Sequence, residues 1–294
     1  MDKVPPKSCI ICGAPPFALE LNSIELWKCT RCDLMWRRSF DVSLSHYTEA
    51  GGGFSEAKAK LQHRNIQDRI RTISKYVDLD GTCDVGGSKG YFVDELVKAG
   101  YKRAYGVDPN KVQIEAAQKR GTPMFVGSTE DAIVLFAQKK TRNATLFHVI
   151  EHLPSPVKNV QEIYDALPPG GHLIIETPDF GGYVFKKLNY RHKLVYEEHL
   201  FYFTFENLQQ FLTNMGFSIV YAGKRDFDQY HLNVRESLFR LGLKEKKSNP
   251  GLMERAIYKF FGIFFTRLFS HLVVWSGRLN FSLVIARKNE RLKH

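Results

Sequence analysis

The feature that most constrains this chain is a glycine-rich stretch, CDVGGSKGYF, at residues 83–92. It follows a short apolar run and precedes VDELVKAG, which has the pattern of an amphipathic helix, so the glycines fall where a strand becomes a helix. Gly86, Gly87 and Gly90 permit a tight turn there and let a ligand lie against the backbone at the helix N-terminus. The stretch predicts a small-molecule site on a strand–turn–helix unit.

Strand-like and helix-like segments alternate along residues 76–225. The apolar runs are TCDVGG, RAYGVD, PMFVG, ATLFHVI, HLIIETP and FSIVYAG, and amphipathic segments such as NKVQIEAAQKRG and PVKNVQEIYDAL separate them. This alternation predicts an α/β fold with a doubly wound, mostly parallel sheet and helices on both faces. Ligands of such sheets bind beyond the carboxyl ends of the strands, where the glycines lie.

An acidic residue supports the prediction of a nucleoside site. Asp108 ends the second strand, in YGVDPN, eighteen residues after Gly90. A carboxylate there can accept hydrogen bonds from both ribose hydroxyls of a bound nucleoside. The alternative is a strand-to-helix turn that binds nothing, which the spacing of Asp108 makes the weaker interpretation.

The first 45 residues contain four cysteines in two C-x-x-C pairs. Cys9 and Cys12 form CIIC, and Cys29 and Cys32 form CTRC after an interval of 16 residues. This spacing is typical of a zinc ribbon, in which four thiolates surround one tetrahedral zinc ion and leave no open position, so we predict a structural metal. The alternatives are unrelated reduced cysteines or a redox pair. Cys83 is expected to be a core or pocket-wall residue.

Residues 76–225 resemble the class I S-adenosylmethionine-dependent methyltransferases, which have a Rossmann-like sheet. The resemblance is carried by DVGGSKGYF, GVDPNKVQIEAAQKRG, FHVIEHLPSPVKNV and LPPGGHLIIETPD. It implies that S-adenosylmethionine binds to Asp84, Gly86, Gly87, Ser88, Gly90, Asp108, Ser128 and His148. Two departures are Ser88, where the family has a glycine, and Ser128, where an acidic residue is common. A dehydrogenase is disfavoured because the G-x-G-x-x-G spacing is absent.

Two histidine-containing segments are candidates for the acceptor side. His152 follows the fourth strand, and we expect either a pocket residue or a polar cap of the next helix. The run VYEEHLFYFT resembles a segment of zinc-binding sugar C-methyltransferases, which also carry an N-terminal four-cysteine module. That resemblance implies that His199 is the general base, that Glu198 orients it or touches the substrate, and that Tyr196 contacts the acceptor.

The remaining segments complete a five-part organisation. We expect a zinc ribbon at 1–45, a linker and helix covering the active site at 46–75, the cofactor-binding core at 76–225, a basic, aromatic helical insertion at 226–277, and the last core strand and tail at 278–294. Residues 252–277 have the pattern of one helix with a wide aromatic face, which predicts either peripheral membrane contact or packing on the core or a second subunit.

Composition narrows the function classes. The chain has 294 residues, 44% of them hydrophobic, and a formal charge of +11, of which +9 lies in residues 224–294 with 15 Lys/Arg against 6 Asp/Glu. We find no signal-peptide pattern and expect a cytoplasmic protein. We predict a methyltransferase acting on a small-molecule or glycan acceptor, with nucleic acid disfavoured as a partner. The alternatives are an RNA or a lipid- or quinone-type methyltransferase, or a non-catalytic cofactor-binding scaffold. The oligomeric state stays open.

Overall fold

The computed structural model describes most of the chain in separate stretches. The described residues are 4–41, 56–182, 185, 195, 196, 198–225 and 281–289, with side chains from residue 62 onward in the first helix. The predicted insertion at 226–277, its membrane-contact segment at 252–277 and most of the linker before residue 56 lie outside these ranges. The domain boundaries, the cytoplasmic location and the membrane contact therefore stay predictions.

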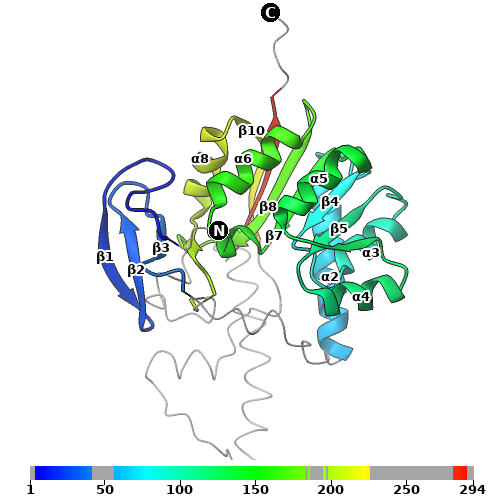
Figure 1. The fold of residues 1–294 in the computed structure, drawn as a ribbon, viewed down its shortest axis with the longest axis horizontal. Helices are drawn as coiled ribbons and strands as arrows, with labels where there is room; N and C mark the ends of the chain where they lie inside the picture. The colour runs from blue at the N-terminus through cyan, green and yellow to red at the C-terminus, as the bar shows by residue number, and fades with distance from the viewer. Residues whose placement is uncertain are drawn as a thin grey trace, which may run out of the picture.

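The described residues form two sheets and the helices that flank them (Figure 1). The strands are β1 (Pro16–Leu21), β2 (Ile24–Cys29), β3 (Met35–Arg37), β4 (Thr82–Val85), β5 (Tyr105–Asp108), β6 (Met124–Val126), β7 (Asn143–Phe147), β8 (His172–Pro178), β9 (Phe201–Tyr202), β10 (Phe217–Arg225) and β11 (Phe281–Lys288). The helices are α2 (Glu56–Ile73), α3 (Tyr91–Lys98), α4 (Lys111–Lys119), α5 (Thr129–Lys139), α6 (Pro156–Ala166) and α8 (Phe205–Asn214), with the 3₁₀ turn η1 (Ile150–His152).

The larger sheet has seven strands in the order β10-β11-β8-β7-β4-β5-β6. The pairings among β4, β5, β6, β7 and β8 are parallel, whereas β11 runs antiparallel between β8 and β10. This sheet confirms the predicted α/β fold class. Because β4 is central and β5 and β7 lie on either side of it, the strand order reverses there and opens a crevice at the carboxyl ends.

Apolar side chains on both faces of the sheet explain why it is wound with helices on each side. Along β8, Leu173 and Ile175 pack in a core with α5, α6 and α8, while Ile174 packs with α2 and α3 on the opposite face. Successive strand residues point to opposite faces, so a run of apolar residues in one strand serves both layers. No described helix is long and apolar enough to span a membrane.

The smaller sheet joins the N-terminal module to a distant segment. Its order is β1-β2-β3-β9, and β3 pairs with β9 through Met35 with Tyr202 and Trp36 with Phe201. The module also bonds to α8, because the Asn207 side chain donates to the Cys32 carbonyl at 3.2 Å. Trp36 is fully buried in the core that the module shares with the larger sheet. The module is thus packed onto the residues that directly follow His199.

Candidate functional site

The glycine-rich turn after β4 has the backbone geometry that its sequence predicts. The N–H groups of Gly86 and Gly87 donate to the Val107 carbonyl on β5 at 2.8 and 3.2 Å. Ser88 has a φ of +49°, a left-handed conformation that favours glycine, which explains why glycine is usual at this position. Its hydroxyl donates to Gln113 at 2.6 Å. Serine is therefore accommodated in the turn by a side-chain bond that glycine lacks.

Asp108 connects the glycine turn to the start of α4. Its Oδ2 accepts the Ser88 N–H at 2.8 Å, and its Oδ1 accepts the Asn110 N–H at 2.8 Å. Each carboxylate oxygen can accept more than one hydrogen bond, so both oxygens keep the capacity to bind a ribose hydroxyl. The structure therefore places Asp108 beside the glycine turn, as the spacing predicts.

Asp84 lies under the turn, at the end of β4. It is buried, and its Oδ1 accepts the Thr145 hydroxyl at 2.6 Å. Burial raises the pKa of Asp84 to about 6, because the charged form has lost its hydration, although the Thr145 bond lowers it. A Cβ on Gly87 would come within 3.0 Å of the Asp84 carboxylate, so only glycine leaves the turn this close to the acid.

A cavity of about 250 Å³ opens beside these residues. Its walls include Asp84, Gly86, Gly87, Ser88, His148 and Arg69. Helix α2 forms part of its wall, with Ile66 also in the lining. The glycine backbone, the acid under the turn and the free capacity of Asp108 together suit a nucleoside that carries an amino-acid group, so the residues fit S-adenosylmethionine.

Three predicted cofactor residues lie outside the lining of this cavity: Asp108, which bonds to Ser88 in the lining, and Ser128 and Gly90, which have structural roles. Ser128 caps α5: its hydroxyl accepts the Asp131 N–H at 3.3 Å, and the Asp131 carboxylate accepts the Ser128 N–H at 2.8 Å. Gly90 begins α3 at a φ of +72°, and a Cβ there would come within 2.9 Å of Met124. A cofactor role for these residues stays a prediction.

A buried charge network forms one wall of the site, and the sequence analysis missed it. Glu176 on β8 is fully buried, and Arg69 of α2 bonds it through two guanidinium nitrogens, one of them Nε at 3.3 Å. His148 Nε2 lies 3.3 Å from Glu176 Oε1, and Arg225 Nε lies 3.7 Å from Oε2. The available signal was a glutamate inside the otherwise apolar run HLIIETP.

This network fixes the charge states of its members. Burial opposes ionisation of Glu176, but Arg69 and His148 outweigh it and hold the pKa at about 2. Burial also lowers the pKa of His148, but contacts with Glu151 and Glu176 outweigh that effect and raise it to about 9. His148 therefore carries a proton at neutral pH and lines the cavity as a cation.

The backbone at His148 is also unusual. Its φ is +58°, a left-handed conformation that costs a non-glycine residue free energy. Its N–H donates to the Glu176 carbonyl at 2.8 Å, which holds the residue in this conformation. The turn directs the chain from β7 into η1, and so brings Glu151 and His152 to the edge of the site.

The two acceptor-side segments meet across η1. His152 Nδ1 lies 2.8 Å from the Glu198 carbonyl, and the Leu200 N–H donates to the Glu151 carbonyl at 2.8 Å. His152 is therefore not the cap of the next helix: α6 begins after Ser155, and the ring bonds to the distant segment instead. This corrects the helix-cap alternative.

His199 is buried within a group of rings. Ring centroids lie at 4.2 Å for Tyr196, 4.7 Å for His152, and 5.9 Å for both Phe180 and Tyr202. The predicted Tyr196 and His199 are thus brought together with His152. Glu198 contacts His152 through its backbone carbonyl, and the buried carboxylate near both imidazoles is that of Glu151.

The four N-terminal cysteines converge at one point. Their sulfur atoms all lie within 4.8 Å of one another, with Cys9 and Cys32 at 3.4 Å and Cys12 and Cys29 at 3.4 Å. Backbone N–H groups donate to the Cys9 and Cys29 sulfurs at 3.3–3.4 Å. Sulfurs around one zinc ion lie about 3.8 Å apart, so this set fits a tetrahedral ion. Cys83 is buried in the core.

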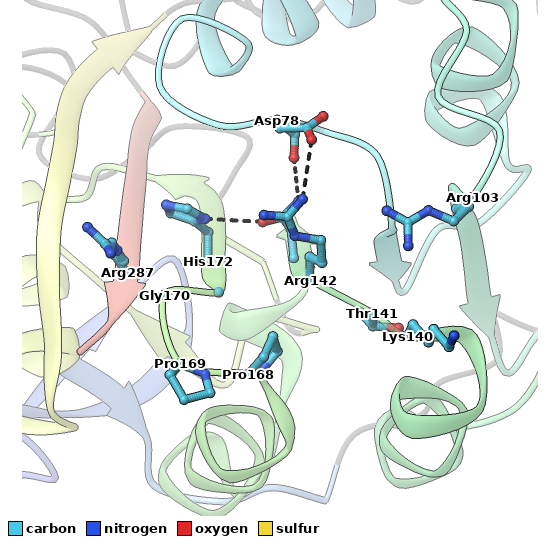
Figure 2. Close-up of a pocket in the computed structure, with 12 residues that line it drawn as sticks. Asp78, Arg103, Lys140, Thr141, Arg142, Pro168, Pro169, Gly170, His172 and Arg287 are labelled. Carbon is cyan, nitrogen blue, oxygen red and sulfur yellow. Dashed lines mark hydrogen bonds and ion pairs between the residues drawn. The ribbon is translucent and has the colours of Figure 1, made fainter. Parts of the chain in front are cut away.

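A second, larger cavity lies at the opposite edge of the seven-stranded sheet (Figure 2). It has a volume of about 540 Å³ and is lined in part by Asp78, Arg103, Lys140, Arg142, His172 and Arg287. Arg142 points toward Asp78, with 3.4 Å between the nitrogen and the oxygen. Because β7 and β8 begin here, the cavity faces away from the carboxyl ends of the strands.

Comparison with known proteins assigns the family. A family model described as a methyltransferase domain matches residues 58–222, more than half of the chain. The chain belongs to this methyltransferase family. It is a class I S-adenosylmethionine-dependent methyltransferase, and the glycine turn, Asp84 and Asp108 all lie within the matched range. The cysteine module and residues 223–294 lie outside that range.

Individual relatives resemble this methyltransferase over part of their length. A tRNA U34 carboxymethyltransferase from Methylococcus capsulatus is 27% identical over 172 residues, which cover 53% of this chain and 51% of that protein. A protein of the same description from Pseudomonas paraeruginosa is 31% identical over 112 residues, covering 36% and 35%. The chain thus spans only a third to a half of these curated relatives.

A solved structure agrees with the fold. A SAM-dependent methyltransferase from Archaeoglobus fulgidus superposes with a TM-score of 0.51 at 16% identity and covers 78% of this chain and 96% of that chain. At this identity the likeness supports the arrangement of the sheet and helices.

Proposed function

We propose that this methyltransferase transfers the methyl group of S-adenosylmethionine to a small acceptor, such as a sugar or glycan precursor, held between the core and the cysteine module. The pairing of β3 with β9 carries the proposal. It places the module directly against the segment that contains His199, so the module would form one side of the acceptor site. This arrangement agrees with the resemblance to the sugar C-methyltransferases, which also carry an N-terminal four-cysteine module.

The residues of the core would hold the cofactor in three places. Asp108 would accept hydrogen bonds from the ribose hydroxyls. The backbone of Gly86 and Gly87 would lie along the amino-acid part of the cofactor, and Asp84 would face the ammonium group of that part. The bound cofactor supplies a methyl group attached to a sulfonium, which is open to in-line attack. Arg69 and α2 would exclude water from this side of the site.

The acceptor would lie beside the two histidines. His199 would take a proton from a carbon next to a carbonyl or from a hydroxyl, and the Glu151 carboxylate would stabilise the resulting imidazolium. The Glu198 carbonyl would orient His152, and the ring of Tyr196 would pack against the acceptor. An aromatic, buried surrounding suits a sugar ring or a similarly compact acceptor.

We also propose that Cys9, Cys12, Cys29 and Cys32 hold a structural zinc ion. Four protein thiolates leave no position for substrate, so the ion would stabilise the fold of the module. Its loss would then act on the acceptor side through β3 and β9.

A second candidate acceptor is RNA. Two observations favour it: the curated relatives are described as tRNA methyltransferases, and the cavity at the amino edge of the sheet gathers several cationic side chains. The location of that cavity opposes it, because an RNA bound there would have to reach around the sheet to the glycine turn.

Binding and transfer can be tested in order. Calorimetric titration with S-adenosylhomocysteine should give binding that Asp108→Ala weakens by at least tenfold, with Asp165→Ala on α6 as a matched control. Transfer of a labelled methyl group would then be measured with sugar nucleotides and with tRNA, using the unchanged protein and His199→Ala. Failure of the nucleoside to bind would overturn the proposal. Labelling of tRNA alone would show that the acceptor is RNA and not a sugar nucleotide.

A further inference from the structure

Three side chains of the acceptor side form a cluster distinct from the four cysteines. Glu151 and His152 come from η1, and His199 comes from the segment before β9. One ligand atom from each lies within 4.8 Å of the other two, and Glu151 and His199 are buried. Two imidazoles and one carboxylate are a ligand set that divalent first-row metal ions bind readily.

The backbone fixes the orientation of one imidazole in this cluster. A carbonyl oxygen can only accept, so the contact of His152 Nδ1 with the Glu198 carbonyl at 2.8 Å places the proton on Nδ1. In the neutral ring, Nε2 then carries the lone pair. Histidines that bind metals are usually held in this way, with the second nitrogen donating to a carbonyl or carboxylate.

One oxygen of the Glu151 carboxylate is available to bind a metal ion. Its Oε2 accepts the Thr177 hydroxyl at 2.9 Å, whereas its Oε1 is buried without a hydrogen bond among the described residues. His148 Nδ1 lies 3.7 Å from Oε1, too far for a hydrogen bond. A fully buried oxygen with no hydrogen bond is costly, and a cation bound to it would remove that cost.

We propose that Glu151, His152 and His199 bind a divalent first-row metal ion such as Zn²⁺, Co²⁺ or Mn²⁺. Small side-chain rotations would bring the three ligand atoms to metal-binding distance, and three protein ligands leave positions open for substrate. The cluster is also next to the cofactor cavity, because His148 lines that cavity and contacts Glu151. The ion would therefore lie close to the cofactor cavity, on the side where the acceptor is proposed to bind.

The role of the ion rests on the proposed methyl transfer and changes one part of it. A metal-bound imidazole nitrogen has no lone pair for a proton, so His199 acts as a ligand instead of a base. A hydroxyl oxygen bound to the ion loses its proton to water and keeps the electron pair that attacks the methyl carbon. The carbon–sulfur bond of the cofactor breaks as the new bond forms. This assignment favours oxygen as the methylated atom.

Cobalt titration separates this site from the cysteine cluster. The protein would be prepared with zinc in the cysteine cluster, treated with a mild chelator and titrated with Co²⁺, while visible absorption and heat are recorded. We expect one Co²⁺ per chain with no thiolate-to-metal charge-transfer band. His199→Ala and Glu151→Gln should weaken it by at least tenfold, whereas His63→Ala on the exposed side of α2 should bind like the unchanged protein.

S-adenosylhomocysteine binding serves as the control for folding and for the proposed function. Variants that bind the nucleoside normally but have lost Co²⁺ support the metal site. Nucleoside binding without a non-thiolate Co²⁺ site, or Co²⁺ binding that His199→Ala leaves unchanged, would overturn the metal site alone. Loss of nucleoside binding in the unchanged protein would instead overturn the proposed function, and the Co²⁺ titration would still decide whether the ion binds.

Discussion

At the scale of single residues, Asp84 combines a proposed cofactor contact with a cost to stability. The acid ionises near pH 3.8 in the unfolded chain and at about pH 6 when folded, because burial disfavours its charge. Between these values the unfolded state loses its proton first, so this group's contribution to folding stability falls as the pH rises. Below pH 3.8 it contributes no penalty, and above pH 6 the full penalty remains.

We therefore expect Asp84→Asn to be more stable than the unchanged protein at pH 7.5, by about 1–3 kcal/mol. Asparagine keeps an oxygen for the Thr145 hydroxyl and carries no charge. The same variant should bind S-adenosylmethionine at least tenfold more weakly, because the positive end of the cofactor loses its partner. Urea unfolding at several pH values and calorimetric titration measure the two effects.

A nearby acid provides the matched control. Asp80 has its pKa lowered by a hydrogen bond from Arg103, so Asp80→Asn should lose a small stabilising contact at neutral pH and leave cofactor affinity unchanged. A lower stability of Asp84→Asn at pH 7.5, or a stability difference that does not shrink between pH 6 and pH 4, would contradict the assignment.

At the scale of elements, the ion pair between Arg69 and Glu176 connects α2 to β8 beside the cofactor cavity. Arg69→Met removes the principal cationic partner of Glu176 and leaves a fully buried carboxylate with His148 and Arg225. Loss of one partner from a buried pair is costly, so we expect a loss of about 2–4 kcal/mol in the free energy of unfolding, with weaker cofactor binding. Chemical denaturation and calorimetry measure these changes.

The double variant Arg69→Met, Glu176→Gln tests the cause. Neutralising the carboxylate removes the uncompensated charge, so we expect the double variant to recover at least half of the lost stability. A matched exposed pair, Arg103 with Asp80, should show coupling below about 1 kcal/mol. Equal stability of the single and double variants would show that Arg69 acts through packing, including its position 4.2 Å from the Phe147 ring centroid.

The β3–β9 pairing predicts that metal loss from the cysteine module acts on the acceptor side. Cys29→Ser, or treatment with a strong chelator, should loosen the module and with it Tyr202 and the segment that holds His199. We expect methyl transfer to fall by at least tenfold while S-adenosylhomocysteine affinity changes by less than about threefold, since the glycine turn belongs to the other sheet. Metal content measured alongside both assays tests this.

Cys83→Ala is the control, because Cys83 is buried in the core and is not one of the four converging cysteines, so its loss should leave the metal bound. If Cys29→Ser weakens nucleoside binding as strongly as methyl transfer, the effect of the module is on the whole fold rather than on the acceptor side.

At the scale of the whole molecule, the sequence was sufficient to predict the seven-stranded sheet and the glycine turn. The alternation of apolar runs and amphipathic helices is a local signal, and Asp108 could be placed because it ends the strand next to that turn. Contacts between distant elements could not be predicted this way. Arg69 and Glu176 are 107 positions apart, and no local sequence pattern at either residue identifies the other as its partner.

The same limit explains the acceptor side. The sequence singled out His152 and His199 but gave no means of showing that the Glu198 backbone holds His152 or that Glu151 supplies the buried carboxylate. The pairing of β9 with β3 involves two residues on each strand, too few for a periodic signal. Ser128 shows the converse case, because a local capping pattern explains its contacts without a ligand.

The cationic side chains of the cavity at the amino edge of the sheet allow the two acceptor classes to be distinguished. Lys140→Glu combined with Arg142→Glu reverses two charges in the cavity at the amino edge of the sheet. Neutralised phosphates release counterions, so we expect the salt dependence of non-specific tRNA binding to decrease by about two in logarithmic slope. S-adenosylhomocysteine affinity and methyl transfer to a small acceptor should stay within twofold, because the glycine turn lies at the opposite edge.

Lys119→Glu combined with Lys158→Glu, an equal charge change on two exposed helices, is the control. A selective loss of tRNA methylation in the cavity variant would identify RNA as the acceptor and the cavity as part of its binding surface.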